Sequence, residues 1–198
     1  MFLECKKYGN EDKLHELVEI FKLEFGKLNN TTISNFRSYY KNDISVYSAD
    51  GNRYDIDFLD SGDDPIPTDW WGLKLFDRED INRIDPYTQN KFHNTIKFLS
   101  TLPNLVRAQY TSVGPSYFVP AHVDTEEGHA HETTEVVNFT ITIHAKGNIT
   151  FRSGNETVIP TPGDFYCIDA FHEEHEANNN SNDHWAILIL QIERSCFL

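Results

Sequence analysis

The stretch Val136-Val-Asn-Phe-Thr-Ile-Thr-Ile-His144 alternates polar and apolar side chains along most of its length. Side chains two residues apart on a β-strand point to the same face, so the alternation predicts a strand with one polar and one apolar face. The polar face would carry Asn138, Thr140, Thr142 and His144, and the apolar face Val137, Phe139, Ile141 and Ile143. If the polar face looks into a barrel, it supplies neutral hydrogen-bonding groups there.

Short runs of similar composition lie on both sides of this strand. They are rich in β-branched and aromatic residues and are separated by Gly, Pro and Asn; they span residues 105–113, 148–151, 157–159, 164–168 and 185–192. Regularly spaced short strands without intervening helices are typical of a sandwich or a barrel. The sequence after Pro103 therefore predicts a mainly β fold.

The sequence before Pro103 has a different pattern. Apolar residues repeat at three- and four-residue steps in residues 11–28 and 88–101, which predicts two amphipathic helices. Residues 44–59 are typical of a β-hairpin, and the Gly, Pro and Asp residues of 60–68 are typical of a loop. Because neither helix interrupts the strand pattern, we expect both to pack outside the barrel.

These segments are expected to form a single domain over residues 1–198, in which 1–102 support a core formed by 103–194. Trp70-Trp71 follows the predicted loop, and the two tryptophans would either pack in the core or line a substrate cleft.

Charge and cysteine content restrict the class of protein. The 198-residue chain carries 17 Lys and Arg against 31 Asp and Glu, a formal net charge of −14, so nucleic acid and anionic membranes are disfavoured as partners. Its three cysteines, Cys5, Cys167 and Cys196, are widely spaced and predict no disulfide framework. With no apolar run of membrane-spanning length and no signal-peptide pattern, we expect a cytoplasmic protein. The sequence does not predict the oligomeric state.

Three residues that can bind a metal ion stand near the expected ends of two strands. His122 and Asp124 are two residues apart and share a strand face, and His175 lies on a later strand that returns to the same place. Two histidines and one carboxylate bind one side of Fe(II) and leave the other side open for substrate and O₂. This pattern favours an iron site over a surface His-x-Asp motif with an unrelated histidine.

A second ligand pattern competes with this site. His129-Ala-His131 and Glu135 resemble the ligands of a cupin, a jelly-roll protein in which a late histidine such as His175 completes the set. The segment lacks the glycine expected upstream and is strongly polar, which favours a flexible loop over the site. Arg107 and Arg152 are expected to be ion-paired structural residues, and His172 to be exposed or to support the metal ligands.

Several segments of the second half of the chain resemble a known enzyme family. Leu102-Pro-Asn-Leu-Val-Arg-Ala-Gln-Tyr110 and Pro120-Ala-His-Val-Asp124 are similar to the first core strand and the metal strand of the aspartyl/asparaginyl β-hydroxylase family, which includes free-proline hydroxylases. Phe151-Arg-Ser-Gly-Asn-Glu-Thr157, Pro162-Gly-Asp164 and the segment from Asp169-Ala-Phe to His175 follow the later part of its pattern. The resemblance covers roughly residues 95–193.

This resemblance implies both a fold and an activity. The fold would be a double-stranded β-helix (a cupin-like jelly roll), mainly β with flanking helices. The activity would be Fe(II)- and 2-oxoglutarate-dependent hydroxylation of an amino acid, an amino-acid side chain or another small molecule. The metal ligands would be His122, Asp124 and His175, and Tyr110 stands where related oxygenases place a tyrosine beside the cosubstrate.

The chain departs from the family at the residue that anchors 2-oxoglutarate. The family has an arginine shortly after the distal histidine, whereas this chain has Trp185, preceded by His184. If 2-oxoglutarate binds, a different set must hold its far carboxylate; we expect it to be drawn from Tyr110, Asn138, Thr140 and His184, the last as a titratable cation. The missing cation keeps a second function open, a cupin-like metal-binding module or sensor without oxygenase activity.

Overall fold

The chain folds into two antiparallel sheets with helices on one side. The computed structural model describes residues 2–4, 8–25, 44–47, 53–55, 70–79, 84, 86–124 and 135–197. Within these ranges the elements are β1 (Phe2–Leu3), α1 (Glu11–Phe25), β2 (Ile44–Tyr47), β3 (Arg53–Asp55), β4 (Trp70–Asp77), α4 (Pro86–Lys91), α5 (His93–Leu99), β5 (Leu105–Val113), β6 (Tyr117–His122), β7 (Val136–His144), β8 (Ile149–Ser153), β9 (Glu156–Val158), β10 (Phe165–Ile168), β11 (His175–Asn179), β12 (Trp185–Glu193) and the 3₁₀ helix η5 (Arg194–Phe197).

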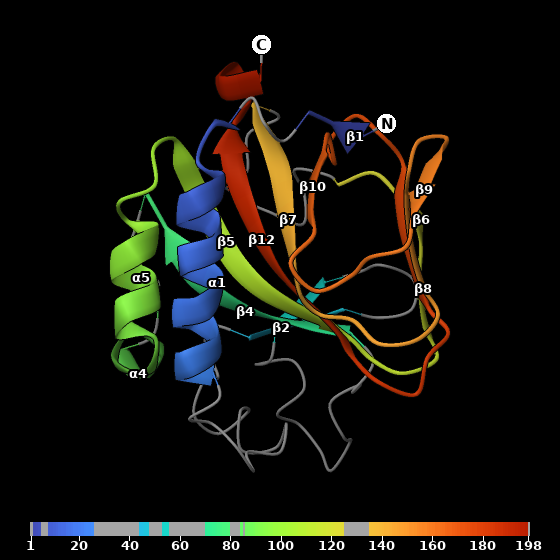
Figure 1. The fold of residues 1–198 in the computed structure, drawn as a ribbon, viewed down its shortest axis with the longest axis horizontal. Coiled ribbons are helices and arrows are strands. Elements are labelled where there is room, and N and C mark those ends of the chain that lie inside the picture. Colours follow the sequence, from blue (N-terminus) through green and yellow to red (C-terminus); the bar gives the residue numbers. More distant parts are fainter. Residues whose placement is uncertain are drawn as a thin grey trace.

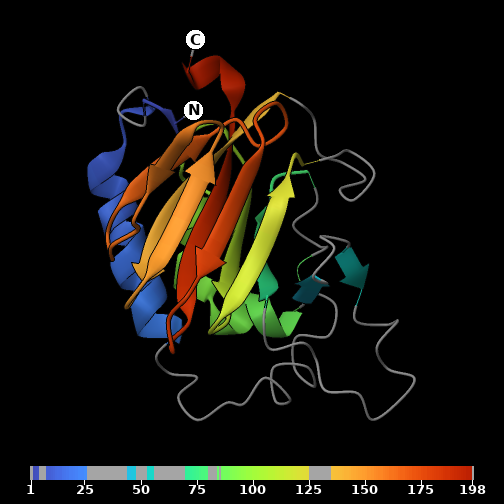
Figure 2. The same ribbon diagram turned by 90° about the vertical axis from the view of Figure 1, so that its right-hand side faces the viewer.

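The strand order is that of a double-stranded β-helix. Among the described residues, the larger sheet has the order β1-β10-β7-β12-β5-β4-β2-β3 and the smaller sheet the order β6-β11-β8-β9. From β5 to β12 the chain passes back and forth between the two sheets, as a jelly roll requires. Figure 2 shows the smaller sheet lying in front of the larger one. The predicted fold class is confirmed.

β7 lies within the larger sheet and is buried on both faces. Val137, Phe139 and Ile141 belong to the main apolar core, which α1 covers from outside the barrel (Figure 1). Asn138, Thr140 and Thr142, on the opposite face, are also buried and look toward the smaller sheet. The sequence pattern therefore identified the two faces of this strand correctly, and the polar face lies inside the barrel.

The helices pack on the outer face of the larger sheet. Leu14, Leu17, Val18 and Phe21 of α1 are buried in that core. The helix expected over 88–101 is instead two helices, α4 and α5, because the backbone at Phe92 leaves the helical conformation at φ −109° and ψ 33°. The Phe92 ring is fully buried and stacks on Phe21, with 5.6 Å between ring centroids, so the break places this ring in the core.

The N-terminal half also contributes strands to the larger sheet. β2 and β3 pair antiparallel, with Val46 opposite Tyr54, which agrees with the predicted hairpin. Its turn and the predicted loop at 60–68 lie outside the described residues. β4, which the sequence analysis did not predict, begins at Trp70 and pairs with β5. β4 and β1 thus extend the larger sheet in opposite directions.

A buried carboxylate joins α1 to α5. Glu24 is 5% exposed and accepts hydrogen bonds from the backbone N–H groups of Asn94 and Thr95 at 3.0 and 2.9 Å. It also accepts bonds from Asn94 Nδ2 at 2.9 Å and Thr95 Oγ1 at 2.7 Å. Because α5 has no side-chain cap of its own at Phe92, Glu24 takes that role from another helix. Burial alone would raise the pKa of Glu24, but these four bonds outweigh it and hold the pKa below its usual value.

We expect Glu24→Gln to lower the free energy of unfolding by about 2 kcal/mol. The NH₂ group that replaces one carboxylate oxygen would face the donors of Asn94 or Thr95, which would then lack an acceptor. A carboxylate with a lowered folded-state pKa stabilises the fold fully above its unfolded pKa and loses this effect as pH falls through the folded pKa. Urea unfolding should therefore show a full difference from wild type near neutral pH that shrinks below about pH 4. The exposed Glu16→Gln on the same helix is the control; an equal effect there would contradict the capping role.

A second buried network ties two connections together at one end of the barrel. Asn179, fully buried, donates through Nδ2 to the carbonyls of Val113, Gly114 and Asp183 at 2.8–3.0 Å. Its Oδ1 accepts from the backbone N–H and the hydroxyl of Ser181. The amide thereby links the β5–β6 connection to the β11–β12 connection.

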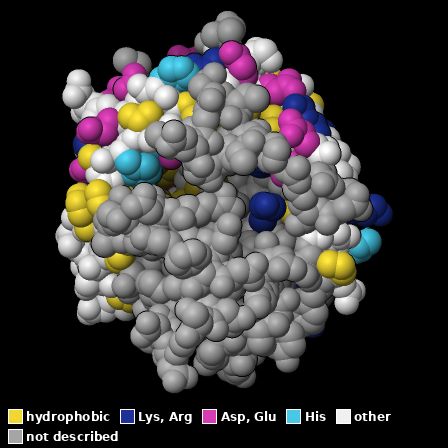
Figure 3. Space-filling view, turned by 180° about the vertical axis from the view of Figure 1, so that it is seen from behind, with side chains coloured by type: hydrophobic (Ala, Val, Ile, Leu, Met, Phe, Trp, Pro, Cys, Tyr) yellow, Lys and Arg dark blue, Asp and Glu magenta, His cyan; other side chains and the backbone are white. Residues whose placement is uncertain are grey.

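Acidic side chains gather along the upper rim of the side shown in Figure 3, in keeping with the net charge of −14. Across the described ranges, no helix has the length and apolar character needed to cross a membrane.

Candidate metal centre

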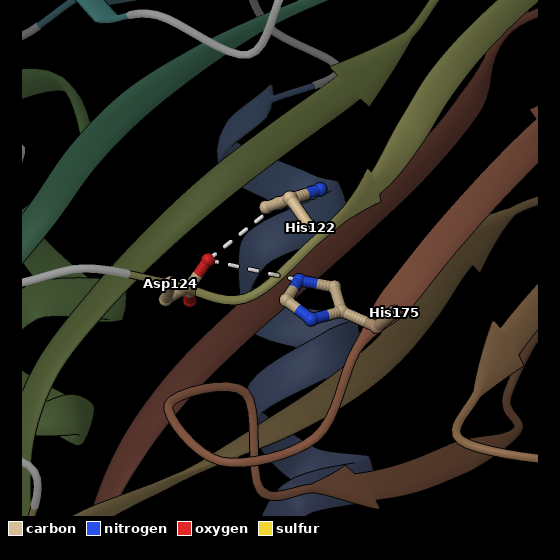
Figure 4. Close-up of side chains that lie close together, drawn as sticks. All are labelled: His122, Asp124 and His175. Carbon is tan, nitrogen blue, oxygen red and sulfur yellow. Dashed lines mark ion pairs between the residues drawn. The ribbon is translucent and has the colours of Figure 1, made fainter.

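Two neighbouring strands of the smaller sheet bring three metal-binding side chains together. His122 ends β6 and His175 begins β11, and the two residues are direct cross-strand partners. Asp124 follows β6 by two residues. One donor atom from each of the three side chains lies within 4.8 Å of the others. The predicted convergence of His122, Asp124 and His175 is confirmed (Figure 4).

A β-bulge sets the pairing of the two histidines. The register between β11 and β6 shifts by one residue between His175 and Ala177: His175 lies opposite His122, but Ala177 lies opposite Val119. In an antiparallel pair without the bulge, the partner of Ala177 would be Pro120. The irregularity therefore lies directly beside the ligand cluster, where bulges commonly redirect a side chain.

Both imidazole Nε2 atoms lie 3.6 Å from one oxygen, Oδ1 of Asp124. Ligand atoms about 2.0–2.2 Å from a common ion are about 3.0–3.6 Å apart at tetrahedral or octahedral angles. The three atoms can thus hold one ion with little movement. Two imidazoles and one carboxylate form the set that leaves coordination positions open on Fe(II).

Backbone carbonyls orient both rings. His122 Nδ1 lies 2.7 Å from the oxygen of Pro120, and His175 Nδ1 lies 3.3 Å from the oxygen of Glu173. A carbonyl oxygen only accepts, so each Nδ1 carries a proton, and Nε2 is the ring nitrogen that faces Asp124 in both residues. Burial lowers the pKa of His175, and Asp124 opposes this only in part. His175 is therefore in the neutral form that binds metals.

Asp124 is held from two sides. Its backbone N–H donates to the oxygen of Ala170 at 2.9 Å, and its Oδ2 accepts a bond from Asn138 Nδ2 at 3.3 Å. Oδ1 is left to face the two histidines. Asn138 of β7 thus lies beside the cluster as predicted, and Thr140 is buried two residues along the same strand face.

The turn before His175 is anchored by an arginine that the sequence analysis missed. Arg194, in η5, donates two bonds to the carboxylate of Asp169, one of them at 2.7 Å from Nη1, and also contacts His172. Burial raises the pKa of Asp169, and the bonds from Arg194 and His172 lower it by more. Because Asp169 precedes Ala170, this ion pair fixes the turn that holds Asp124. No spacing rule connects residues so far apart.

The structure does not bring Tyr110 and His184 to the cluster, contrary to the prediction. Tyr110 lies in the outer core against Phe21 and Phe25 of α1, with ring centroids 5.4 and 4.8 Å away, and burial raises the pKa of its hydroxyl. His184 Nδ1 is 3.2 Å from Ser112 Oγ, and Ser112 in turn bonds Tyr110. Both residues lie on the helix side of the larger sheet, away from the space between the two sheets, because side chains alternate between the two faces along β5 and β12.

Other predicted side chains fall as follows. Trp185 points between the sheets and contacts Phe151 of β8, with ring centroids 5.6 Å apart. Arg107 pairs with Asp77, and Arg152 pairs with Glu174 and Glu176, so both are ion-paired as expected. For the competing cupin set, His129 and His131 lie outside the described residues, and Glu135 is exposed and is no part of the cluster above.

The first of the two tryptophans that follow the predicted loop lies beside the site. The Trp70 ring lies beside His122, with centroids 6.0 Å apart, so it borders the metal cluster. Lys74, on the same face of β4 by alternation and opposite Gln109 of β5, is half-buried. The sequence analysis missed Lys74 because it did not predict β4.

Comparisons with known proteins give likenesses of fold only. No protein-family model matches the sequence, and no curated protein matches it. Among solved structures, it is similar to a predicted oxalate decarboxylase from Thermotoga maritima (14% identity, covering 63% of this chain and 80% of that one, TM-score 0.39). It is also similar to a cupin-2 domain from Rhodospirillum rubrum (11% identity, 63% and 60% covered, TM-score 0.39). A third is an uncharacterised double-stranded β-helix protein from Klebsiella pneumoniae (11% identity, 70% and 89% covered, TM-score 0.40). The fold assignment rests on the strand order described above.

Proposed function

We propose that this protein is a mononuclear non-haem Fe(II) dioxygenase that uses 2-oxoglutarate to hydroxylate an amino acid, an amino-acid side chain or another small molecule. The observation that carries the proposal is the donor arrangement at the cluster. Two imidazoles present Nε2 to one carboxylate oxygen, and backbone carbonyls hold both Nδ1 protons. The resemblance of residues 95–193 to the aspartyl/asparaginyl β-hydroxylases supports the choice of reaction.

With iron and 2-oxoglutarate bound, such a site supplies the O₂ chemistry that inserts one oxygen atom into a substrate C–H bond while the 2-oxo acid loses CO₂ and becomes succinate. The chain itself would provide the ligands and the orientation. His122, Asp124 and His175 would hold the ion, and Asn138 would keep Asp124 Oδ2 turned away from it. The Trp70 ring beside His122 would form an apolar wall that restricts water at the site.

The substrate is expected to be small and not a polyanion. A net charge of −14 repels polyphosphates and nucleic acids over distances of about 8–10 Å at physiological salt. The side chains of His122, Asp124 and His175 are only 28%, 16% and 10% exposed, which favours a small molecule at the cluster over a large partner.

A second candidate is a cupin-like metal-binding module or sensor without oxygenase activity. Trp185 favours it, since an indole stands where the resembling family has the arginine that anchors 2-oxoglutarate. An indole N–H donates one hydrogen bond and carries no charge, so it holds a carboxylate less strongly than a bidentate arginine.

Anaerobic titration of the Fe(II)-loaded protein with 2-oxoglutarate distinguishes the two candidates. Chelation of the iron by the 2-oxo acid should produce a visible charge-transfer band that saturates at one equivalent per chain. The Zn(II)-loaded protein is the control and should give no band. Iron binding without a band would favour the metal-binding module, and failure to bind a divalent metal would reject both candidates.

A further inference from the structure

Three buried side chains of the larger sheet carry polar atoms that have no hydrogen-bond partner within the described part of the chain. They are Thr111 Oγ1 of β5, Thr142 Oγ1 of β7 and Trp185 Nε1 of β12. The three residues are 2%, 0% and 1% exposed. Buried polar groups are nearly always paired, so three unpaired ones in neighbouring strands need an explanation.

These atoms lie on the same face at one end of the barrel. Ile187 of β12 is the direct cross-strand partner of both Thr111 and Thr142, so the two threonines flank it in adjacent strands. Trp185 precedes Ile187 by two residues and shares its face. Trp185 and Ile187 belong to the apolar cluster between the sheets, together with Phe151. We call Thr111, Thr142 and Trp185 the inner donor set.

A shared strand face connects the inner donor set to the metal cluster. Asn138, which bonds Asp124, is on the same face of β7 as Thr142 but four residues earlier. Asn138 Oδ1 and Gln191 Oε1, on paired residues, are also buried and have no partner among the described residues. This face therefore carries such atoms at two places, at Asn138 and Gln191 and at the inner donor set.

The chemistry of the inner donor set restricts its ligand. An indole N–H can only donate, and each hydroxyl can donate one bond, so the ligand must present acceptor oxygens. None of the three side chains carries a charge. They therefore suit a carboxylate that is held by neutral donors in an enclosed site, where hydrogen bonds are stronger than in water.

We propose that the inner donor set binds the far carboxylate of 2-oxoglutarate, in place of a basic anchor. This inference rests on the proposed function and names the residues that would select a dicarboxylic 2-oxo acid at that site. It replaces the sequence-based expectation for Tyr110 and His184, which point to the other side of the sheet.

The proposal predicts opposite effects on stability and on binding. Thr111→Val and Thr142→Val replace an unpartnered hydroxyl with a methyl group of the same shape, so the ligand-free protein should melt a few degrees higher. If the hydroxyl instead made a hydrogen bond that stabilises the ligand-free fold, its replacement by a methyl group would lower the melting temperature. Thr88→Val is the matched control, since its hydroxyl is also buried without a partner but lies in α4, outside the barrel. It should raise the melting temperature and leave binding unchanged.

The test is anaerobic calorimetry of the Fe(II)-loaded protein with two probes, 2-oxoglutarate and 2-oxopentanoate, which has the same chain length but no far carboxylate. Wild type should prefer 2-oxoglutarate. Thr111→Val, Thr142→Val and Trp185→Phe should each weaken 2-oxoglutarate binding by about 5- to 10-fold, the equivalent of one hydrogen bond, and leave 2-oxopentanoate binding unchanged.

Each other outcome has a definite meaning. Retained preference in all three variants would overturn the inference while leaving the proposed function intact. Loss of preference in Lys74→Met, with none in the threonine variants, would overturn it by assigning the carboxylate to that lysine. Equal weakening of both probes would also overturn it, as a general disturbance of the site. Wild-type iron protein that binds neither acid would reject the proposed function and this inference together.

Discussion

Replacing His175 with alanine should lower the affinity of the protein for Fe(II) by more than about 100-fold, which exceeds the usual effect of losing a residue that only orients a ligand. His175 is buried, lies opposite His122 on the neighbouring strand and points Nε2 at Asp124. With it removed, only two of the three donors remain. Metal content after anaerobic reconstitution, together with a competition titration, measures the loss.

His172→Ala is the matched control for this substitution. His172 lies in the turn just before His175, but it is exposed and contacts Asp169 and Arg194 instead of the cluster. This variant should bind Fe(II) within a few-fold of wild type. Iron binding that survives in His175→Ala, or that is lost equally in both variants, would contradict the assigned ligand set.

Asn179→Asp should lower the free energy of unfolding by about 4 kcal/mol or more at neutral pH, a larger loss than we expect for Glu24→Gln. The new carboxylate would face the carbonyl oxygens of Val113, Gly114 and Asp183 in a fully buried position. In a chain of this length such a change lowers the melting temperature by roughly 10 °C. Thermal unfolding followed by circular dichroism measures it.

The destabilisation should depend on pH in a defined direction. Burial against acceptors raises the folded-state pKa of the introduced carboxyl, so the variant is least affected at low pH and loses stability as pH rises through that pKa. The neighbouring Asn180 is exposed, so Asn180→Asp should have a melting temperature close to that of wild type. An Asn179→Asp protein as stable as the Asn180 control would show that this network contributes little.

The sequence predicted features that follow from local periodicity. The two faces of β7 were identified correctly because strict alternation has only two phases and apolar residues occupy one of them. His122 and Asp124 were placed together for the same reason, and a return strand supplied His175. The break at Phe92 was not predictable, because Phe92 keeps the helical spacing of apolar residues and leaves the helix only to reach Phe21.

The errors concern contacts between distant elements. Tyr110 was placed in the barrel, yet β5 is buried on both faces, so its alternation does not reveal which face meets the helices. The bonds of Glu24 to Asn94 and Thr95, and of Arg194 to Asp169, join residues far apart in the chain that only the tertiary fold brings together. β4 was missed because the preceding residues had the composition of a long loop.

The β-bulge between His175 and Ala177 makes the ligand cluster a reporter of strand alignment. A slip of one residue between β6 and β11 would move His175 away from His122 and reverse the faces of the side chains that follow. An ion held by both imidazoles would therefore bind only molecules with the native alignment. Such binding would lower the free energy of the native alignment relative to slipped pairings. Occupancy of the site would then distinguish correctly aligned molecules from compact misaligned ones during refolding.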